Sequence, residues 1–159
     1  MSSGTLEAMK VSKRIYLDAC SINRPFDDQS QERVHLETEA VETILAHVDR
    51  GDWLWVGSSA LVYEVANLSD QDRRERLGEL LAEVREWIRG GDREDKRAAA
   101  LVALGFTPLD ALHVACAETA EVEVFLTTDD RLLKKAQRQA GELQVRVANP
   151  LRWLEEQIL

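Results

Sequence analysis

The sequence predicts an α/β fold in which a parallel sheet is covered by helices on both faces. Short apolar segments rich in β-favouring residues alternate with longer segments in which apolar residues recur every three or four positions. Such alternation is typical of βαβ units, whose strands pair in parallel. The length of 159 residues, a hydrophobic content of 45% and the lack of repeats indicate one globular domain. We expect this domain to span 13–159, after a flexible N-terminal extension at 1–12.

The first half of the chain contains two predicted strands and three predicted helices. In the second strand, Trp53 and Trp55 alternate with aliphatic residues, and Ser58 or Ser59 can cap the helix that follows. In chain order we expect a strand at 15–17, a loop at 21–31, a helix at 31–49, a strand within 51–59, a helix at 60–68 and a charged amphipathic helix at 69–88.

The second half contains four predicted helices and two predicted strands. Thr107 occupies the N-cap position of one helix and Pro108 its first turn, which is a typical helix start. A further short edge strand is expected near Trp87. In chain order we expect a break at 89–95, a helix at 96–104, a helix at 107–120, a strand at 122–128, a helix at 129–140, a strand at 143–147 and a helix at 149–159.

Charge and cysteine usage exclude several functional classes. Lys and Arg number 20 and Asp and Glu number 29, so the net charge is −9, which argues against a passive coat for nucleic acid or anionic lipid. Cys20 and Cys116 have no CxxC or CxxH context and predict neither a zinc site nor a disulfide framework. No segment approaches the ~18 apolar residues of a membrane span, and the opening residues lack the apolar stretch expected of a signal peptide. We expect a cytoplasmic protein without a membrane anchor.

Acidic residues lie next to the predicted strands. Asp18 follows the first strand, and Asp129 and Asp130 follow a later one. Asp110 lies in the first turn of a helix, and Glu64 lies inside the helix after the second strand. Each has an ordinary alternative, namely a turn or helix cap for the aspartates and a solvated helix face for Glu64.

The fold prediction brings several of these carboxylates together, because the carboxyl ends of parallel strands meet at one edge of a sheet. Converging carboxylates repel one another unless a hard divalent cation such as Mg²⁺ or Mn²⁺ lies between them. Carboxylates that hold one or two such ions are a common device for hydrolysing phosphodiesters. The pattern therefore favours a metal-dependent hydrolase.

Four segments carry a resemblance to a known family. They are "YLDACSIN", "SSALVYEVANLSD", "GFTPLDALHVACAE" and "VFLTTDDRLLKKA". In order and spacing they resemble the PIN-domain nucleases, and within these the VapC-type toxins of bacterial toxin–antitoxin pairs and their single-domain relatives. The resemblance covers the chain from Arg14 to about Glu155. It implies a three-layer α/β/α sandwich with a central parallel sheet, and an endoribonuclease that leaves 5′-phosphate and 3′-hydroxyl ends.

The resemblance also implies a site and partners. The metal-binding and catalytic acids of the family fall on Asp18, Glu64, Asp110 and Asp129, which would hold Mg²⁺ or Mn²⁺, with Asp130 as a neighbour. The expected partners are an RNA substrate, a small antitoxin protein and a second copy of the chain. Exposed apolar residues on the charged helix at 69–88 would suit such a homodimer.

Two features depart from the family pattern. Family members carry Ser or Asn two residues after the first Asp, where a polar side chain orients that carboxylate, but this chain has Cys20 there. We therefore expect Ser21 or Asn23 to substitute for it. The long segment at 21–33 is also atypical of the short toxins.

Other polar residues have both structural and functional interpretations. His113 lies one helical turn from Asp110, and we expect it to pack or to form hydrogen bonds, because oxygen-rich Mg²⁺ sites rarely use imidazole. Glu37 and Glu39 are expected to be solvated, and the alternative for either residue is to support the acid cluster from behind. Candidates for contacts with RNA phosphates, or for a merely solvated surface, are Arg24, Arg33, Arg131, Lys134 and Lys135.

Two other functions compete with the metal-dependent ribonuclease. A receiver or phosphatase domain that uses an aspartyl phosphate would need a Lys at the end of the last strand, and "LQVRVANP" has none. A catalytically silent PIN-like scaffold that binds RNA or a protein partner stays open. Metal binding with or without nuclease activity would separate this scaffold from the enzyme.

Overall fold

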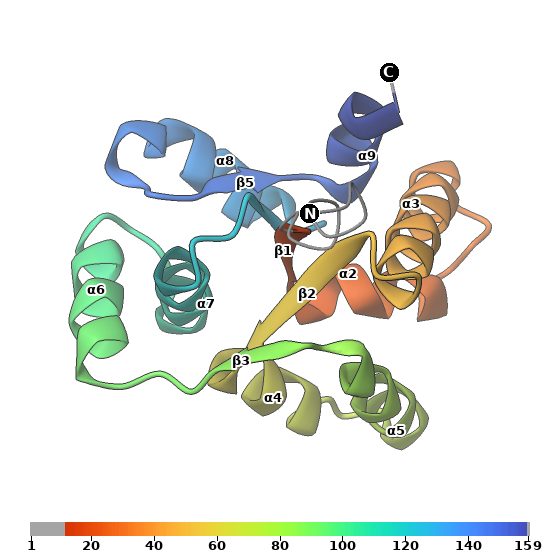
Figure 1. Cartoon of the computed structure of the whole chain (residues 1–159), viewed down its shortest axis with the longest axis horizontal. Helices are drawn as coiled ribbons and strands as arrows, with labels where there is room; N and C mark the ends of the chain where they lie inside the picture. Colours follow the sequence, from red (N-terminus) through yellow and green to blue (C-terminus); the bar gives the residue numbers. More distant parts are fainter. Residues whose placement is uncertain (1–11, 159) are drawn as a thin grey trace, which may run out of the picture.

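A five-stranded parallel sheet forms the centre of the protein (Figure 1), with strand order β3-β2-β1-β4-β5. The computed structural model describes residues 12–158, so the predicted extension at 1–12 lies outside the described residues except for its last position. Within 12–158, no helix is long and apolar enough to cross a membrane. The strands are β1 (Lys13–Leu17), β2 (Trp53–Ser58), β3 (Glu86–Ile88), β4 (Val124–Leu126) and β5 (Arg146–Ala148).

Helices cover both faces of the sheet, which confirms the predicted three-layer α/β/α sandwich. Alternate residues of a strand point to opposite faces, so Ile15 and Leu17 pack in one core and Tyr16 in the other. The first face carries α2 (Ala19–Asn23), α3 (Glu32–Asp49), α4 (Ser59–Ala66), α5 (Gln71–Leu80) and α9 (Pro150–Ile158). The second face carries α6 (Asp92–Ala103), α7 (Pro108–Thr119) and α8 (Asp130–Arg138).

The strand register brings three polar chain segments to the same edge of the sheet. On the central strand β1, Tyr16 is paired with Val56 of β2, and Leu17 is paired with Leu126 of β4. Asp18 is therefore level with the end of β2 on one side and with the start of the β4–α8 connection on the other. This edge is where the fold prediction placed the acids.

The structure differs from the sequence prediction at two connections. Residues 19–23, which overlap the predicted loop at 21–31, form the short helix α2, because the Asp18 side chain accepts a hydrogen bond from the Ser21 backbone N–H and caps this helix. The predicted helix at 69–88 ends at Leu80, and β3 follows. In this segment, pairing with β2 and packing of the Trp87 ring on Gly57 outweigh the helical sequence pattern. The packing is close, because a Cβ atom at Gly57 would lie 2.7 Å from the ring.

The predicted apolar surface on the charged helix is wrong. Leu77 of α5 is fully buried, and Leu80 packs against the same core, so this helix turns its apolar residues inward. Among the described residues, the exposed large apolar side chains are Val62 and Tyr63 of α4, Trp87 of β3 (which lies inside the predicted helix at 69–88), Leu36, Val102 and Ile158.

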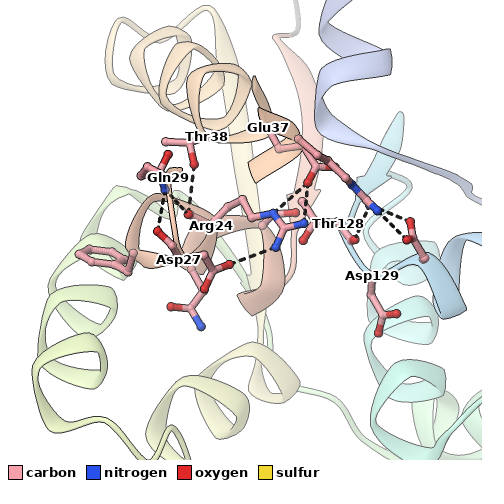
Figure 2. A network of polar contacts seen from close by, with 12 residues as sticks. Arg24, Asp27, Gln29, Glu37, Thr38, Thr128 and Asp129 are labelled. Carbon is pink, nitrogen blue, oxygen red and sulfur yellow. Dashed lines mark hydrogen bonds and ion pairs between the residues drawn. The ribbon is translucent and has the colours of Figure 1, made fainter. Parts of the chain in front are cut away.

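A buried acid, Glu37, ties α3 to two other parts of the fold (Figure 2). Its carboxylate accepts hydrogen bonds from Arg24 at 2.7 and 2.8 Å and from Arg33 at 3.3 Å, as well as from Asn149. Arg33 also binds Asp130 and the Thr128 carbonyl, on either side of Asp129. With an exposed fraction of 2%, Glu37 is not the solvated residue that the sequence predicted.

The same network holds the segment before α3. Arg24 donates to Asp27 at 3.1 Å, and its carbonyl accepts hydrogen bonds from Gln29 and Thr38 (Figure 2). Arg73 of α5 donates to the other oxygen of Asp27 at 2.9 Å. The long polar segment that the sequence flagged as atypical is therefore anchored to two helices.

We predict that Glu37→Gln destabilises the protein by roughly 3 kcal/mol or more, because two guanidinium groups lose the buried charge that compensates them. The matched control is Glu39→Gln, which changes an exposed residue of the same helix and should stay within about 0.5 kcal/mol of the wild type. Urea unfolding measures both free energies of unfolding. Equal effects of the two substitutions would contradict a structural role for Glu37.

Candidate functional site

Asp18 is a buried carboxyl group at the end of the central strand. Its Oδ1 accepts a hydrogen bond from the Ser21 N–H at 3.0 Å, and the hydroxyl of Thr127 also bonds to the side chain. Burial first, and then the negative charge of Glu64, raise the pKa of Asp18 to about 7, although these hydrogen bonds act in the opposite direction. Without a cation nearby, Asp18 is therefore costly to ionise.

Glu64 reaches from α4 across to the start of α2. Its Oε1 accepts hydrogen bonds from the Ala19 N–H and from His113 Nε2, both at 3.1 Å. Burial is the largest single influence on Glu64 and would raise its pKa, but the interactions with His113 and the hydrogen bond from the Ala19 N–H together outweigh burial, and the pKa lies below its usual value. Glu64 is thus held as a carboxylate beside an Asp18 that tends to keep its proton.

A buried chain of hydrogen bonds stands behind Glu64. The Tyr16 hydroxyl lies 2.5 Å from His113 Nδ1 and 2.6 Å from Ser58 Oγ. Since Nε2 donates to the Glu64 carboxylate, a neutral imidazole accepts at Nδ1, so Tyr16 donates to His113 and Ser58 donates to Tyr16. His113 therefore forms hydrogen bonds, as expected, and it fixes the direction in which Glu64 points.

Asp110 and Asp129 face a common cleft of about 410 Å³ between α7 and α8. Asp129 is the N-cap of α8, where its Oδ1 accepts the N–H groups of Arg131 and Leu132. In Figure 2 its side chain lies apart from the Glu37 network. The pKa of Asp110 is raised, first by burial and then by the charges of Asp129 and Glu64.

The structure brings all four predicted acids into the neighbourhood of one side chain, that of Cys20. The pKa of its thiol is raised by burial and by the negative charges of these four residues, Asp18, Glu64, Asp129 and Asp110. Within residues 12–158, however, no three Asp, Glu, His or Cys side chains are arranged to hold a metal ion as they stand. The carboxylates are near neighbours, and a shared ion requires rotation of their side chains.

Two carboxylates keep one oxygen free for such rotation. Hydrogen bonds from the described residues reach Glu64 at Oε1 and Asp129 at Oδ1, and none from this part of the chain reaches Oε2 or Oδ2. Asp130 differs, because both of its oxygens are bound by Arg33 at 2.6 and 2.7 Å. Asp130 is therefore engaged outside the cleft.

The side chains expected to replace the missing Ser or Asn at position 20 do not do so. The Ser21 hydroxyl donates to the Leu126 carbonyl at 3.0 Å, and Asn23 accepts a hydrogen bond from Arg73. Thr127 supplies the hydroxyl instead, from the adjacent strand end. Thr127 lies two residues before Asp129 in the sequence, but its contact with Asp18 depends on the pairing of β1 with β4.

The predicted basic residues fall into two groups. Arg24 and Arg33 are engaged in ion pairs with Glu37, Asp27 and Asp130, and their contact with RNA phosphates stays a prediction. The second group consists of the three basic residues on α8, which are Arg131, Lys134 and Lys135.

Comparison with solved structures finds the same fold in two proteins. A chain in the crystal structure of VapBC2 from Rickettsia felis, bound to a DNA fragment from its promoter, is 10% identical with a TM-score of 0.53, and the alignment covers 86% of this chain and 98% of that one. PAE2754 from Pyrobaculum aerophilum is 16% identical with a TM-score of 0.52, and 92% and 97% are covered. No family model matches the sequence, and no curated protein is significantly similar to it. The likeness shows that the chain has the PIN-like fold that its motifs implied.

We predict that the stability of the metal-free protein falls as pH rises from about 4 to about 7. Unfolded Asp18 has a pKa near 3.9, whereas the folded value is about 7, so the folded state binds more protons in this window and loses that advantage as pH rises. Asp18→Asn should remove this dependence and be more stable than the wild type at pH 8, by a few kcal/mol in order of magnitude.

Urea unfolding in EDTA at pH 5 and pH 8 measures this effect. Asp49→Asn, at an exposed position of α3, is the control and should parallel the wild type at both pH values. A difference between wild type and Asp18→Asn that is the same at both pH values would contradict the expected ionisation of Asp18.

Proposed function

We propose that this chain is a Mg²⁺- or Mn²⁺-dependent endoribonuclease. The observation that carries the proposal is the convergence of four carboxylates on one edge of a PIN-like sheet, where Asp18 is too poor in compensating charge to ionise easily. Phosphodiester hydrolysis is the chemistry for which oxygen-ligated divalent cations are suited. The sequence resemblance to the PIN-domain nucleases supports RNA as the substrate class.

The residues present fit such an ion in their chemistry. The donor set consists of carboxylate oxygens, which Mg²⁺ and Mn²⁺ prefer, and lies in a site that a positive charge would stabilise. When bound, the ion would supply a positive charge beside the scissile phosphate and make a nearby water more acidic. The residues that would hold it are Asp18, Glu64, Asp110 and Asp129.

Residues behind these acids keep them oriented without neutralising them. His113 fixes Glu64 through a hydrogen bond, and Thr127 does the same for Asp18. Arg33 binds the chain on both sides of Asp129 and leaves its side chain in the cleft. Orientation by such partners is what maintains affinity and activity at metal sites.

We expect RNA cleavage by the wild type in Mg²⁺ or Mn²⁺ and none in EDTA. Asp110→Asn should abolish cleavage, because it removes a metal ligand, and should leave the metal-free fold as stable or more stable, because it relieves repulsion. Cleavage of labelled RNA followed on a denaturing gel, together with urea unfolding, tests both parts. Asp95→Asn, at an exposed position of α6, is the control.

Four outcomes would decide against this mechanism. Robust cleavage in chelator, or full activity of Asp110→Asn, would exclude the carboxylate–metal mechanism. Metal-independent RNA binding without any cleavage would favour a PIN-like scaffold. A large loss of stability in Asp110→Asn would make this residue a helix-capping group.

We further propose that the enzyme is a cytoplasmic toxin that acts as a homodimer and is controlled by a small antitoxin protein. The structural likeness to VapBC2 supports such a partner. An antitoxin would most simply block the site by placing an Arg or Lys side chain among the four acids in place of the metal. Exposed apolar residues at Val62, Tyr63 and Trp87 supply a surface for the dimer.

Expression of the chain alone should arrest growth, and co-expression of a small protein encoded beside it should restore growth. In vitro the partner should suppress RNA cleavage, and excess Mg²⁺ should weaken this suppression, because metal and basic side chain compete for one cluster. Asp110→Asn should fail to arrest growth. Normal growth on overexpression, with no partner protein recovered in pull-downs, would contradict the proposed toxin role. The proposal of a nuclease that acts without an antitoxin would be unaffected.

A further inference from the structure

We infer that one face of α8 is a binding track for single-stranded RNA that leads away from the carboxylates. Arg131, Lys134, Lys135 and Arg138 are spaced by three or four residues, so they share one face of this helix. The inference rests on the proposed nuclease function, and it assigns to that site the surface that holds the substrate.

The track begins inside the cleft that contains the acids. Arg131 and Lys135 line this cleft together with Asp110 and Asp129. The Lys135 ammonium reaches the opposite wall, since a Cβ at Gly105, in the turn before α7, would lie 2.7 Å from its Nζ. A phosphodiester bound at the carboxylates would therefore have cations from α8 as its immediate neighbours.

The cations of the track are free to bind a ligand. Across residues 12–158, no side-chain hydrogen bond or ion pair engages any of the four α8 cations. By contrast, Arg24 and Arg33 each bind two acidic residues, and Arg97 binds Glu118. The α8 face thus carries positive charge that the protein itself does not use.

The chemistry of this face favours nucleic acid over protein. The exposed residues of α8 are all charged or polar, whereas the centres of protein interfaces are depleted in Lys and enriched in aromatic residues. Arg131 and Arg138 are about 10 Å apart along the helix axis, which matches two to three phosphates at ~3.4 Å per nucleotide of a stacked strand.

A local track also answers the problem of net charge. The chain carries −9 overall, but charges beyond the Debye length of ~8 Å are screened at physiological salt, so the cations next to the cleft act on RNA more strongly than distant acids do. Attraction between RNA phosphates and the α8 cations offsets the repulsion between these phosphates and the carboxylates.

The test compares two double variants that lose the same charge. Arg131→Gln/Lys135→Gln removes two cations of the track, and Arg93→Gln/Lys96→Gln removes two exposed cations of α6 that are likewise without ion pairs among the described residues. Fluorescence anisotropy measures the Kd of a short labelled single-stranded RNA of mixed sequence, in EDTA to prevent cleavage, over a series of salt concentrations.

For the α8 variant we expect Kd to rise several-fold or more at low salt. The slope of log Kd against log salt should fall by about 1.4, which is ~0.7 for each lost phosphate contact. The α6 variant should keep the wild-type Kd and slope. Equal effects of the two variants, or no effect of either, would overturn the inference.

Two further results separate this inference from the proposed function. If the wild type shows no metal-dependent cleavage, the nuclease proposal fails, while a selective loss of RNA affinity in the α8 variant still supports the track. If the α8 variant binds and cleaves RNA as the wild type does, the nuclease stands and the track fails. If the α8 variant keeps the wild-type affinity for RNA but no longer binds an acidic protein that the wild type binds, the α8 face is a protein-binding surface. That result would likewise overturn the inferred track.

Discussion

The repulsion between carboxylates at one edge of the sheet is the constraint on which the rest of the site depends. Asp18 ends the central strand, with β2 on one side and β4 on the other, so its carboxyl group is screened from water by neighbouring chain. The resulting pKa of about 7, to which the charge of Glu64 contributes, means that the two groups are not ionised together at low cost. A fold that places acids here must either bind cations or keep a proton.

The protein binds these acids mainly through hydrogen-bond donors rather than through Arg or Lys side chains. Backbone N–H groups, the Thr127 hydroxyl and the His113 imidazole interact with the carboxyl groups. A guanidinium in the same place would form a permanent ion pair and occupy the position that a metal needs. The guanidinium of Arg33 is directed to Asp130, one residue beyond the acid that faces the cleft.

The features that the sequence predicted well are those fixed by local contacts. Thr107 and Asp129 cap their helices through bonds to residues two or three positions on, so their roles are visible in the sequence alone. The Tyr16–His113 bond joins residues that are 97 positions apart, and the Asn149–Glu37 bond joins residues 112 apart, and no periodic pattern reports either. Glu37 looked solvated because the sequence shows the helix face but not the segments packed against it.

The fold errors have the same origin. The pattern at 69–88 is amphipathic throughout, yet β3 forms because an edge of β2 is available to pair with it. The predicted loop at 21–31 begins as the helix α2, which Asp18 caps in line with its helix-cap alternative, and the segment that follows α2 is anchored by Arg24 and Arg73. In both cases a partner distant in sequence decided between two local structures that the residues themselves allow.

Asp129 joins the negative and the positive parts of the surface. As the N-cap of α8 it places one carboxylate in the cleft, while the helix that it starts carries the unpaired cations. Lys135 lies one turn and a half beyond it along the helix, about 9 Å, and this spacing is set by helix geometry rather than by a loop. Glu37 reinforces the separation, since it draws Arg24 and Arg33 inward and leaves α8 as the basic wall of the cleft. The distance between the carboxylates and the nearest free cations is therefore rigid, which is what a site needs if one strand must be held and cut at a fixed place.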